Sequence, residues 1–348
     1  MTENFGDRLR AARKMAGFSM DRLAKEAGGI VTKQAISKYE KNKMKPDSRV
    51  LNALSKALGV KVEYFFRDSM VSLSGLEFRK KSKLAKKVED QIKQKTLDFL
   101  ERYVEVEEVL NQKAEYKNPL SGFKIKNRDD IEQAAKKLRS KWYLGDAPIS
   151  NLMELLEDKG IRIFEVDVND EFDGLSAFVG DIPVIAVRAR NDLVRKRFTI
   201  AHELGHIMLD FSATEDQSQE RFCHSFAGAL LLPENIIYAE LGQQRNKITL
   251  WELKKLKGIY GISIQAIMAR AHNLGIISDY SYREFCIILN KKGWKKIEPG
   301  TYEGKERPNR FKQLVYHAVA EEIISFSRGA ELFNMMLPEF RRRVQIVS

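Results

Sequence analysis

The sequence predicts a multidomain protein that is mainly α-helical and contains one α+β domain. Apolar residues recur at helical spacing along most of the 348 residues, which predicts amphipathic helices. The stretch LSAFVGDIPVIAV is instead typical of two strands that are joined by a turn at Gly180-Asp181. The length suffices for two or three domains. We expect the chain to divide into four parts: a domain over residues 1–70, a long helical linker over 71–118, a domain over 119–245 and a helical region over 246–348.

Composition and charge indicate a soluble protein with a polyanionic partner. The chain is 43% hydrophobic and 31% charged, with a net charge of +12. Residues 1–70 hold 15 Lys and Arg against 8 Asp and Glu, a net of +7, so we expect nucleic acid to bind there. No apolar run approaches the roughly 18 residues of a membrane span, no signal-peptide core begins the chain, and the two cysteines form no C-x-x-C pair. We therefore expect a cytoplasmic protein with no membrane contact.

Residues 1–70 predict five short helices, in the stretches LRAARKMAG, SMDRLAKEAGG, TKQAISKYEKN, RVLNALSKALG and VEYFF. Ser19 and Thr32 are typical N-cap residues at the starts of the second and third helices. These two helices and their short turn predict a helix-turn-helix, whose second member enters the major groove of double-stranded DNA. We therefore expect operator DNA as a partner.

The third helix carries the expected DNA-reading face. Its residues Ala35, Ile36 and Tyr39 would pack inward. A Gln at the start of such a helix can pair with adenine, Lys prefers guanine edges, and lysines beyond the helix lie where phosphates pass. The expected DNA-binding residues are Thr32, Lys33, Gln34, Ser37, Lys38 and Lys43. The alternative is a small helical domain used for dimerisation.

This segment resembles the Xre or lambda-repressor-type DNA-binding family over residues 5–66. The string TKQAISKYE matches that family's recognition helix, whereas GGIV makes the preceding turn longer than the commonest one. The resemblance implies a lambda-repressor-like domain of five helices. We also expect a homodimer, which half-sites about one helical turn apart would indicate.

A long helix is predicted over residues 76–111. Apolar residues follow helical spacing there, and neither Gly nor Pro interrupts the stretch after Gly75. The helix would pack on the next domain or pair with its copy in a homodimer. The stretch AEYKNPL then ends it.

The segment RKRFTIAHELGHIMLD, residues 195–210, predicts a zinc site. His202 and His206 are four residues apart, so both imidazoles share one helix face and can hold one zinc ion. Glu203 points away from that face by about 100°. This placement suits a general base that acts on a metal-bound water. Two buried core histidines are the alternative, although an H-E-x-x-H arises by chance in well under roughly 1% of such sequences.

The segment TEDQSQERFCHSFAGALLLPEN, residues 214–235, predicts a second helix that supplies the third zinc ligand. We favour Glu220, since two His and one Glu form a known hydrolytic zinc site. His224, one turn further on, is the competing ligand, and we favour a hydrogen-bonding role beside the metal ligands for it. Small Ala227 and Gly228 would let the two helices approach closely.

AHELGH and the downstream pattern E-x-x-C-H-x-F-A-x-x-L-L-L-P resemble the ImmA/IrrE family of zinc-dependent endopeptidases. The resemblance extends upstream over WYLGDAPISNLMELLEDKGIRIFEV and covers roughly residues 128–245. It implies a zincin-like α+β catalytic domain with Zn²⁺ as cofactor. The implied metal ligands are His202, His206 and Glu220, and the implied catalytic acid and base is Glu203. Such peptidases relieve repression by cutting a regulator, often in mobile elements or stress responses.

Residues 246–348 predict further helices. The stretch ITLWELKKLKGIYGISIQAIMARAHNLGIIS has a helix-turn-helix-like layout without a concentrated basic face, so we expect packing or ligand sensing. The tail from Phe311 to Leu337 is again helical.

These features favour a DNA-binding transcriptional regulator whose zinc endopeptidase controls gene expression by cutting a protein, which could be itself, a partner repressor or a toxin. Two other hypotheses stay open. An antitoxin of a toxin-antitoxin pair would bind operator DNA and its toxin without cutting. A ligand-sensing repressor would keep zinc only structurally, but Glu203 would then be unnecessary.

Overall fold

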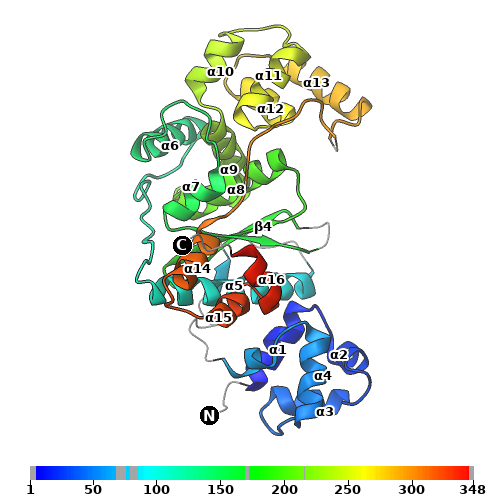
Figure 1. Ribbon diagram of the computed structural model, residues 1–348. Coiled ribbons are helices and arrows are strands. Elements are labelled where there is room, and N and C mark those ends of the chain that lie inside the picture. The colour runs from blue at the N-terminus through cyan, green and yellow to red at the C-terminus, as the bar shows by residue number, and fades with distance from the viewer. Residues whose placement is uncertain are drawn as a thin grey trace. The chain divides into compact units, whose positions relative to one another are not determined.

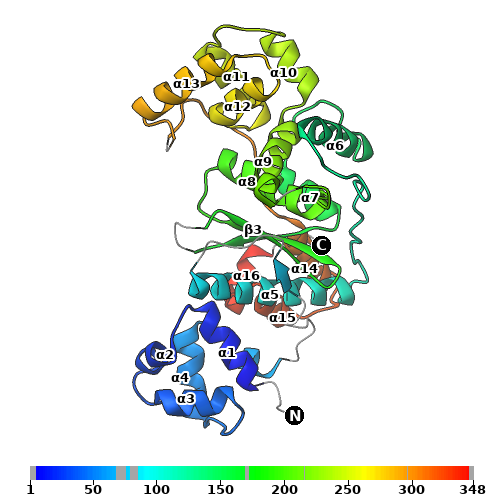
Figure 2. The ribbon, with the colours of Figure 1, turned by 180° about the vertical axis from the view of Figure 1, so that it is seen from behind.

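The computed structural model describes residues 5–67, 76–78, 85–168, 172–214, 216–295 and 297–344. Helices dominate these residues, and they contain one small sheet (Figure 1, Figure 2), which confirms the predicted fold class. None of the described helices is long and apolar enough to cross a bilayer. The chain forms two compact units. The first unit comprises Met1–Leu76, Lys81–Ala114 and Asn309–Ser348, and the second comprises Glu77–Lys80 and Glu115–Pro308.

Five short helical elements begin the first unit, as the sequence predicts. Their apolar faces meet in one core, and the last element is a 3₁₀ turn. Their bounds are α1 Phe5–Met15, α2 Met20–Glu26, α3 Lys33–Glu40, α4 Ser48–Leu58 and η1 Val62–Phe66. Ser19, Thr32 and Asp47 cap α2, α3 and α4, because each side chain accepts a hydrogen bond from a backbone N–H of the first turn.

The long turn between α2 and α3 is built on two glycines. Gly28 and Gly29 both adopt left-handed backbone angles, with φ of 76° and 70°. Residues with a Cβ rarely adopt this conformation, so the GG pair lets the chain leave α2 and still bury Val31 in the core.

A buried carboxylate fixes α3 to α1. Glu40 accepts hydrogen bonds from Nε and Nη2 of Arg13 at 2.6 and 2.8 Å. A Cβ on Gly6 would lie 2.6 Å from the carbonyl oxygen of Glu40, so α1 approaches the end of α3 as closely as glycine permits. The side chain of Asn42 completes the contact by accepting the N–H of Gly6 at 2.8 Å. These contacts set the direction of α3.

The long helix is shorter than predicted, and it packs differently. It is α5, Lys86–Val109, whereas Leu76–Phe78 form strand β1, and residues 79–84 lie outside the described part of the chain. Within the first unit, α5 contacts α1 and α14, Arg310–Ala320. The predicted connection between domains is therefore a structural helix.

Polar and aromatic contacts hold α5 in the first unit. Arg8 pairs with Glu101 at 2.6 Å, Lys14 pairs with Asp90 at 3.0 Å, and the Gln91 amide donates to the Met15 carbonyl at 2.9 Å. On another side, the rings of Phe99 and Tyr103 on α5 meet the Phe311 ring of α14. Phe311 in turn contacts Phe333, which follows α15 (Phe326–Leu332) and packs on Phe340 of α16 (Leu337–Arg343). The chain end thus returns to a helix more than two hundred residues upstream, which divides the expected 246–348 segment between the units.

The second unit contains a four-stranded sheet of order β1-β3-β4-β2. Strand β3, Gly174–Val179, pairs antiparallel with β4, Ile182–Arg188, around the left-handed Gly180. This confirms the two predicted strands and their turn. Strand β2, Arg162–Val166, runs parallel to β4 on the other side.

Helices α7 and α8 pack on this sheet, and a large apolar core forms between the elements of the unit. α8, Leu193–Met208, contacts both β3 and β4, α9 packs on α8, and α6 packs on α9. The remaining helices are α6 Arg128–Lys141, α7 Leu152–Asp158, α9 Asp216–Leu231, α10 Glu234–Leu241, α11 Leu250–Tyr260, α12 Ile264–Asn273 and α13 Asp279–Lys291. The helix-turn-helix-like pair α11 and α12 is tied into this core, because the buried Arg270 pairs with Glu132 of α6 at 2.6 Å.

A wholly buried ion pair positions α8. Arg197 on α8 donates to Glu306, and its other terminal nitrogen donates to the Ile149 carbonyl at 2.8 Å. Glu306 also accepts the N–H groups of Leu152 and Met153, at 3.1 and 3.2 Å, and so caps α7. Burial raises the pKa of Glu306, and both Arg197 and these N–H groups oppose that rise. The pair thereby joins α7, α8 and the extended segment 297–308.

Replacing Glu306 with alanine should lower the free energy of unfolding of the second unit by about 3–5 kcal/mol, because the buried Arg197 charge then lacks its carboxylate. Urea unfolding followed by circular dichroism measures the change. Glu303→Ala, at an exposed position of the same segment, is the matched control and should unfold like the wild type. Equal midpoints for the two variants would contradict a central role for the pair.

Candidate functional site

Helix α8 presents the H-E-x-x-H residues inside the second unit. Asp192 caps the helix by accepting the Arg195 N–H at 3.0 Å. One face of α8 meets β3 and β4, and another meets α9. His202, Glu203 and His206 are only 6%, 3% and 7% exposed. Buried side chains with this many polar atoms require partners, which β3 and α9 supply.

A glycine sets the distance between α8 and α9. A Cβ on Gly205 would lie 3.2 Å from Sγ and 3.3 Å from Cα of Cys223, so the helices are nearly in backbone contact there. The sequence placed this close approach at Ala227 and Gly228, which is wrong for Gly228: a Cβ there would meet only Arg270, at 3.7 Å. The side chain of Cys223 is wholly buried at this contact.

The structure brings the three predicted ligands together. The Nε2 atoms of His202 and His206 lie 3.2 Å apart. The Glu220 carboxylate on α9 lies 3.5 Å from Nε2 of His202 and 3.3 Å from Nε2 of His206. Two imidazoles and a carboxylate converge on one point, and this donor set is the one that zinc takes in hydrolytic sites. The residues therefore fit a zinc ion.

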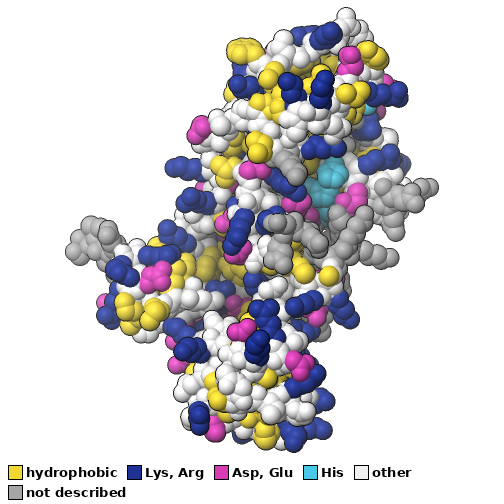
Figure 3. All heavy atoms as spheres, turned by 90° about the vertical axis from the view of Figure 1, so that its right-hand side faces the viewer, with side chains coloured by type: hydrophobic (Ala, Val, Ile, Leu, Met, Phe, Trp, Pro, Cys, Tyr) yellow, Lys and Arg dark blue, Asp and Glu magenta, His cyan; other side chains and the backbone are white. Residues whose placement is uncertain are grey.

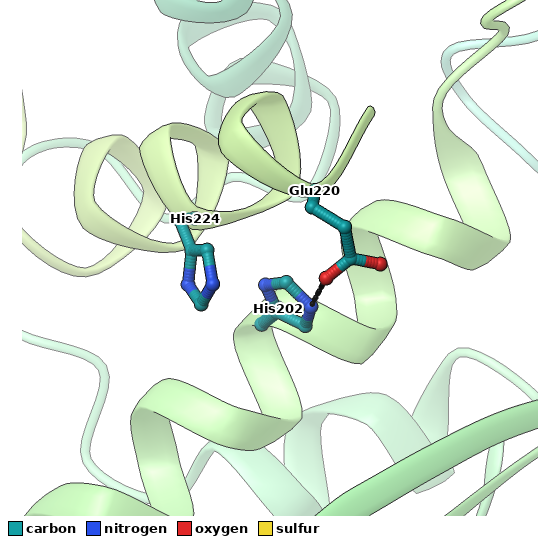
Figure 4. Close-up of side chains that lie close together, drawn as sticks. All are labelled: His202, Glu220 and His224. Carbon is teal, nitrogen blue, oxygen red and sulfur yellow. Dashed lines mark ion pairs between the residues drawn. The ribbon is translucent and has the colours of Figure 1, made fainter. Parts of the chain in front are cut away.

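His224 lies beside this group, one turn from Glu220 (Figure 4). Its ring centroid is 4.3 Å from that of His202 and 5.9 Å from that of Phe198. His202, Glu220 and His224 also offer ligand atoms within 4.8 Å of one another, so two possible ligand sets share His202 and Glu220. Nδ1 of His202 is buried and has no hydrogen-bond partner among the described residues. On the face that Figure 3 shows, histidine side chains reach the surface beside Lys, Arg, Asp and Glu side chains.

Strand β3 supplies a residue that the sequence reasoning missed. Ser176, wholly buried, donates a hydrogen bond to Oε2 of Glu203 at 2.7 Å. A Cβ on Gly174 would lie 2.4 Å from the Thr199 side chain and 3.3 Å from Cγ of Glu203, so β3 lies directly on α8. A buried serine in an otherwise apolar strand was the available signal. Its partner could not be read, because the strand and the helix are separate in sequence.

The expected DNA-reading face lies on α3. Lys33, Gln34 and Lys38 are exposed, and Ser37 is half-buried. Ile36 and Tyr39 point into the core, as the helical spacing predicts. Thr32 accepts the Ala35 N–H at 3.2 Å, so its hydroxyl serves as the helix cap. The exposed side chains are therefore available on one face.

Two features modify this face. Nζ of Lys33 pairs with Asp21 of α2 at 2.7 Å, so Lys33 must exchange that carboxylate before it can contact a base. After α3, Asn42 adopts a left-handed φ of 55° and turns the chain, and Lys41, Lys43 and Lys45 are all exposed around this turn. These lysines form a basic edge next to α3.

Known proteins match two separate parts of the chain. Residues 9–65 match the family model described as a helix-turn-helix, and residues 156–272 match the model described as an IrrE N-terminal-like domain. The second match includes α11 and α12 and so extends beyond the expected boundary at residue 245. Both resemblances seen in the sequence are thereby confirmed.

A curated relative matches the helix-turn-helix part. It is the SPbeta prophage-derived uncharacterized HTH-type transcriptional regulator YonR of Bacillus subtilis (strain 168), which is 38% identical over 63 residues. The matched part is 18% of this chain and 56% of that protein. No solved structure matches the chain.

Alanine at His202, His206 or Glu220 should yield protein with little bound zinc, because each change removes one of three donors. Chelation should also lower the melting temperature of the wild type, since a ligand present at a hundredfold its Kd stabilises the folded state by about 2.7 kcal/mol. Metal analysis and thermal unfolding measure both effects. His224→Ala is the control and should keep its zinc. Zinc retained by Glu220→Ala and lost by His224→Ala would instead make His224 the third ligand.

Proposed function

We propose that this protein is a DNA-binding transcriptional regulator with a zinc-dependent endopeptidase, and that cleavage of itself or of a partner regulator controls gene expression. The helix-turn-helix match and the IrrE-like match support the two halves of the proposal. The observation that carries the peptidase half is the buried Glu203 beside the three converging donors, with its carboxylate held by Ser176.

In this proposal His202, His206 and Glu220 hold zinc, with His224 next to them. Zinc held by these residues would lower the pKa of a bound water toward about 7 and would polarise the substrate carbonyl. Glu203 takes the proton from the attacking water and delivers it to the leaving amide nitrogen. The Ser176 hydroxyl donates a hydrogen bond to the Glu203 carboxylate and so fixes its direction.

The DNA half rests on the exposed face of α3. Gln34 at the start of the helix reads a base, and Lys43 binds a phosphate. Lys33 contributes only when it leaves Asp21. A homodimer on two half-sites about one helical turn apart would double this contact.

Substitutions on the two kinds of DNA contact should differ in their effects. Gln34→Ala should cost about 1–3 kcal/mol on the cognate operator and little on random DNA. Lys43→Ala should weaken binding to all sequences and reduce the salt slope by about one. Titrations at several salt concentrations measure both quantities. Lys56→Ala on α4 removes the same charge elsewhere and serves as the control. Equal losses for Gln34→Ala on both DNAs would exclude α3 as the recognition helix.

Glu203→Gln should abolish proteolysis and leave zinc content, melting temperature and operator affinity near the wild-type values, because the residue moves a proton and does not hold the metal. In cells this variant should repress its promoter permanently. Glu234→Gln, an exposed position on α10, removes one carboxylate charge as a control and should behave like the wild type.

Two outcomes would favour the antitoxin hypothesis instead. One is normal derepression by Glu203→Gln under the natural trigger. The other is the absence of any cleaved protein from the wild type. In either case the second unit would act by binding a partner.

A further inference from the structure

A pocket of about 360 Å³ lies in the second unit, apart from the metal donors. Its walls are α6, the loop after α6, the end of α9 and the start of α10, and these helices lie next to one another (Figure 1, Figure 2). Ala229 of α9 lines the pocket nine residues after Glu220, which is a rise of about 13 Å along the helix. The pocket volume falls within the roughly 300–1,000 Å³ of small-molecule sites.

One wall of this pocket contains a buried positive charge. Arg139 of α6 is 4% exposed, and its guanidinium donates to the carbonyl oxygens of Gly145, Ala147 and Leu230 at 2.7, 2.5 and 2.5 Å. These three acceptors are neutral, and no carboxylate of a described residue forms an ion pair with Arg139. A guanidinium has five N–H donors, so two of them remain for a further acceptor.

Arg139 differs in this respect from two other buried arginines of the same unit. Arg197 pairs with Glu306, and Arg270 pairs with Glu132. A buried cation without a carboxylate partner costs free energy, because the protein replaces its hydration only in part. Burial accordingly lowers the pKa of Arg139. A negatively charged group in the pocket would reduce this cost.

Further positive charge surrounds the pocket. Lys136, exposed on α6 and three residues before Arg139, lines it as well. Helix α10 begins at Glu234 without a side-chain cap, and Pro233 and Asn235 line the pocket. The first N–H groups of a helix lack intrahelical partners and carry partial positive charge, so they favour an anion at this end.

The carboxylates that line the pocket have partners or lie at its exposed rim. Both oxygens of Glu132 accept from Arg270, at 2.6 and 2.8 Å. Asp146 accepts from the Asn235 amide at 2.5 Å and is exposed. Glu234 is exposed as well. The buried part of the pocket is therefore positive, and its rim has both signs of charge.

We propose that this pocket binds a small oxyanion, a carboxylate or a phosphate group, with Arg139 and Lys136 as its cationic contacts and the first N–H groups of α10 as further donors. The shared chemistry of such ligands is a negative charge spread over several oxygen acceptors, which matches a guanidinium and a helix start. Binding would stabilise the folded second unit. The proposal is independent of peptidase activity.

Calorimetric titration of the full-length protein with succinate and with inorganic phosphate tests the site and distinguishes the two kinds of oxyanion. At constant ionic strength, at least one of them should bind saturably, whereas chloride should not. Lys136→Gln should weaken this binding at least about fivefold, which corresponds to roughly 1 kcal/mol. Lys136 is the position to change because it is exposed, whereas Arg139 also holds the loop after α6. Lys141→Gln, at an exposed position of α6 outside the pocket, is the matched control and should bind like the wild type.

Removing a negative charge should have the opposite effect. Asp146→Asn keeps an oxygen that can accept from Asn235 and should tighten anion binding, because it removes a like charge from the rim. Equal affinities of Lys136→Gln and Lys141→Gln, or weaker binding by Asp146→Asn, would overturn the proposal.

Hydrogen exchange measured with and without the anion locates the site. Amides of residues 143–147 and of the first turn of α10 should exchange more slowly when the anion is bound. His206→Ala, which lacks a metal donor, should bind the anion as the wild type does, and this separates the pocket from anion binding at zinc. Absence of binding by both anions, or protection confined to α8 and the first half of α9, would overturn the proposal.

Discussion

The close approach of α8 to its neighbours is the constraint on which the candidate metal centre depends. Three donors from two helices can meet within hydrogen-bonding distance only if those helices are nearly in backbone contact, and Gly205 against Cys223 provides that contact. Gly174 does the same for β3 on the other side, where Ser176 then reaches Glu203. A methyl group at either glycine would separate the elements by tenths of an ångström or more. Glu203, Ser176 and the three metal donors would then no longer lie at the distances that the site requires.

Buried arginine–glutamate pairs set the orientation of the helices, as the two glycines set the distances between neighbouring elements. Arg197 with Glu306 directs α8 one and a half turns before the metal donors, and Arg13 with Glu40 directs α3 at the end opposite its exposed Gln34. A buried pair adds little net stability because both ions lose their hydration, yet one broken partner is costly. Such pairs therefore exclude alternative packings more than they strengthen the correct one, which suits elements that must present side chains in fixed directions.

The features that depend on neighbouring residues could be predicted from the sequence, whereas the pairings of distant segments could not. The H-E-x-x-H spacing, the caps at Ser19 and Thr32 and the turn at Gly180 depend on neighbours within a few residues, and the structure has all of them. Glu220 was identified from a pattern of residues along one more helix. Ser176, the strand at Leu76–Phe78 and the packing of α14 on α5 depend on chain segments tens to hundreds of residues apart. Periodicity carries no information about such pairings, so the segment around β1 read simply as the start of a helix.

The order of the chain explains why the segment between η1 and α5 differs from every other connection. Most of the second unit is inserted between α5 and α14, and those two helices pack together, so that part of the chain is closed by folded structure on both sides. In contrast, a single covalent connection joins α1–η1 to the rest of the chain. The helix α1 also contacts α5 through the Arg8–Glu101 and Lys14–Asp90 pairs and through the hydrogen bond from Gln91 to the Met15 carbonyl. Of these two ion pairs, Arg8–Glu101 is largely buried, with side chains 7% and 13% exposed, whereas Lys14–Asp90 is partly exposed and contributes about 1 kcal/mol or less. The attachment of α1–η1 to the rest of the first unit therefore depends on contacts with α5, and the buried Arg8–Glu101 pair is the one that fixes its geometry most strictly, because a buried charge that loses its partner is costly.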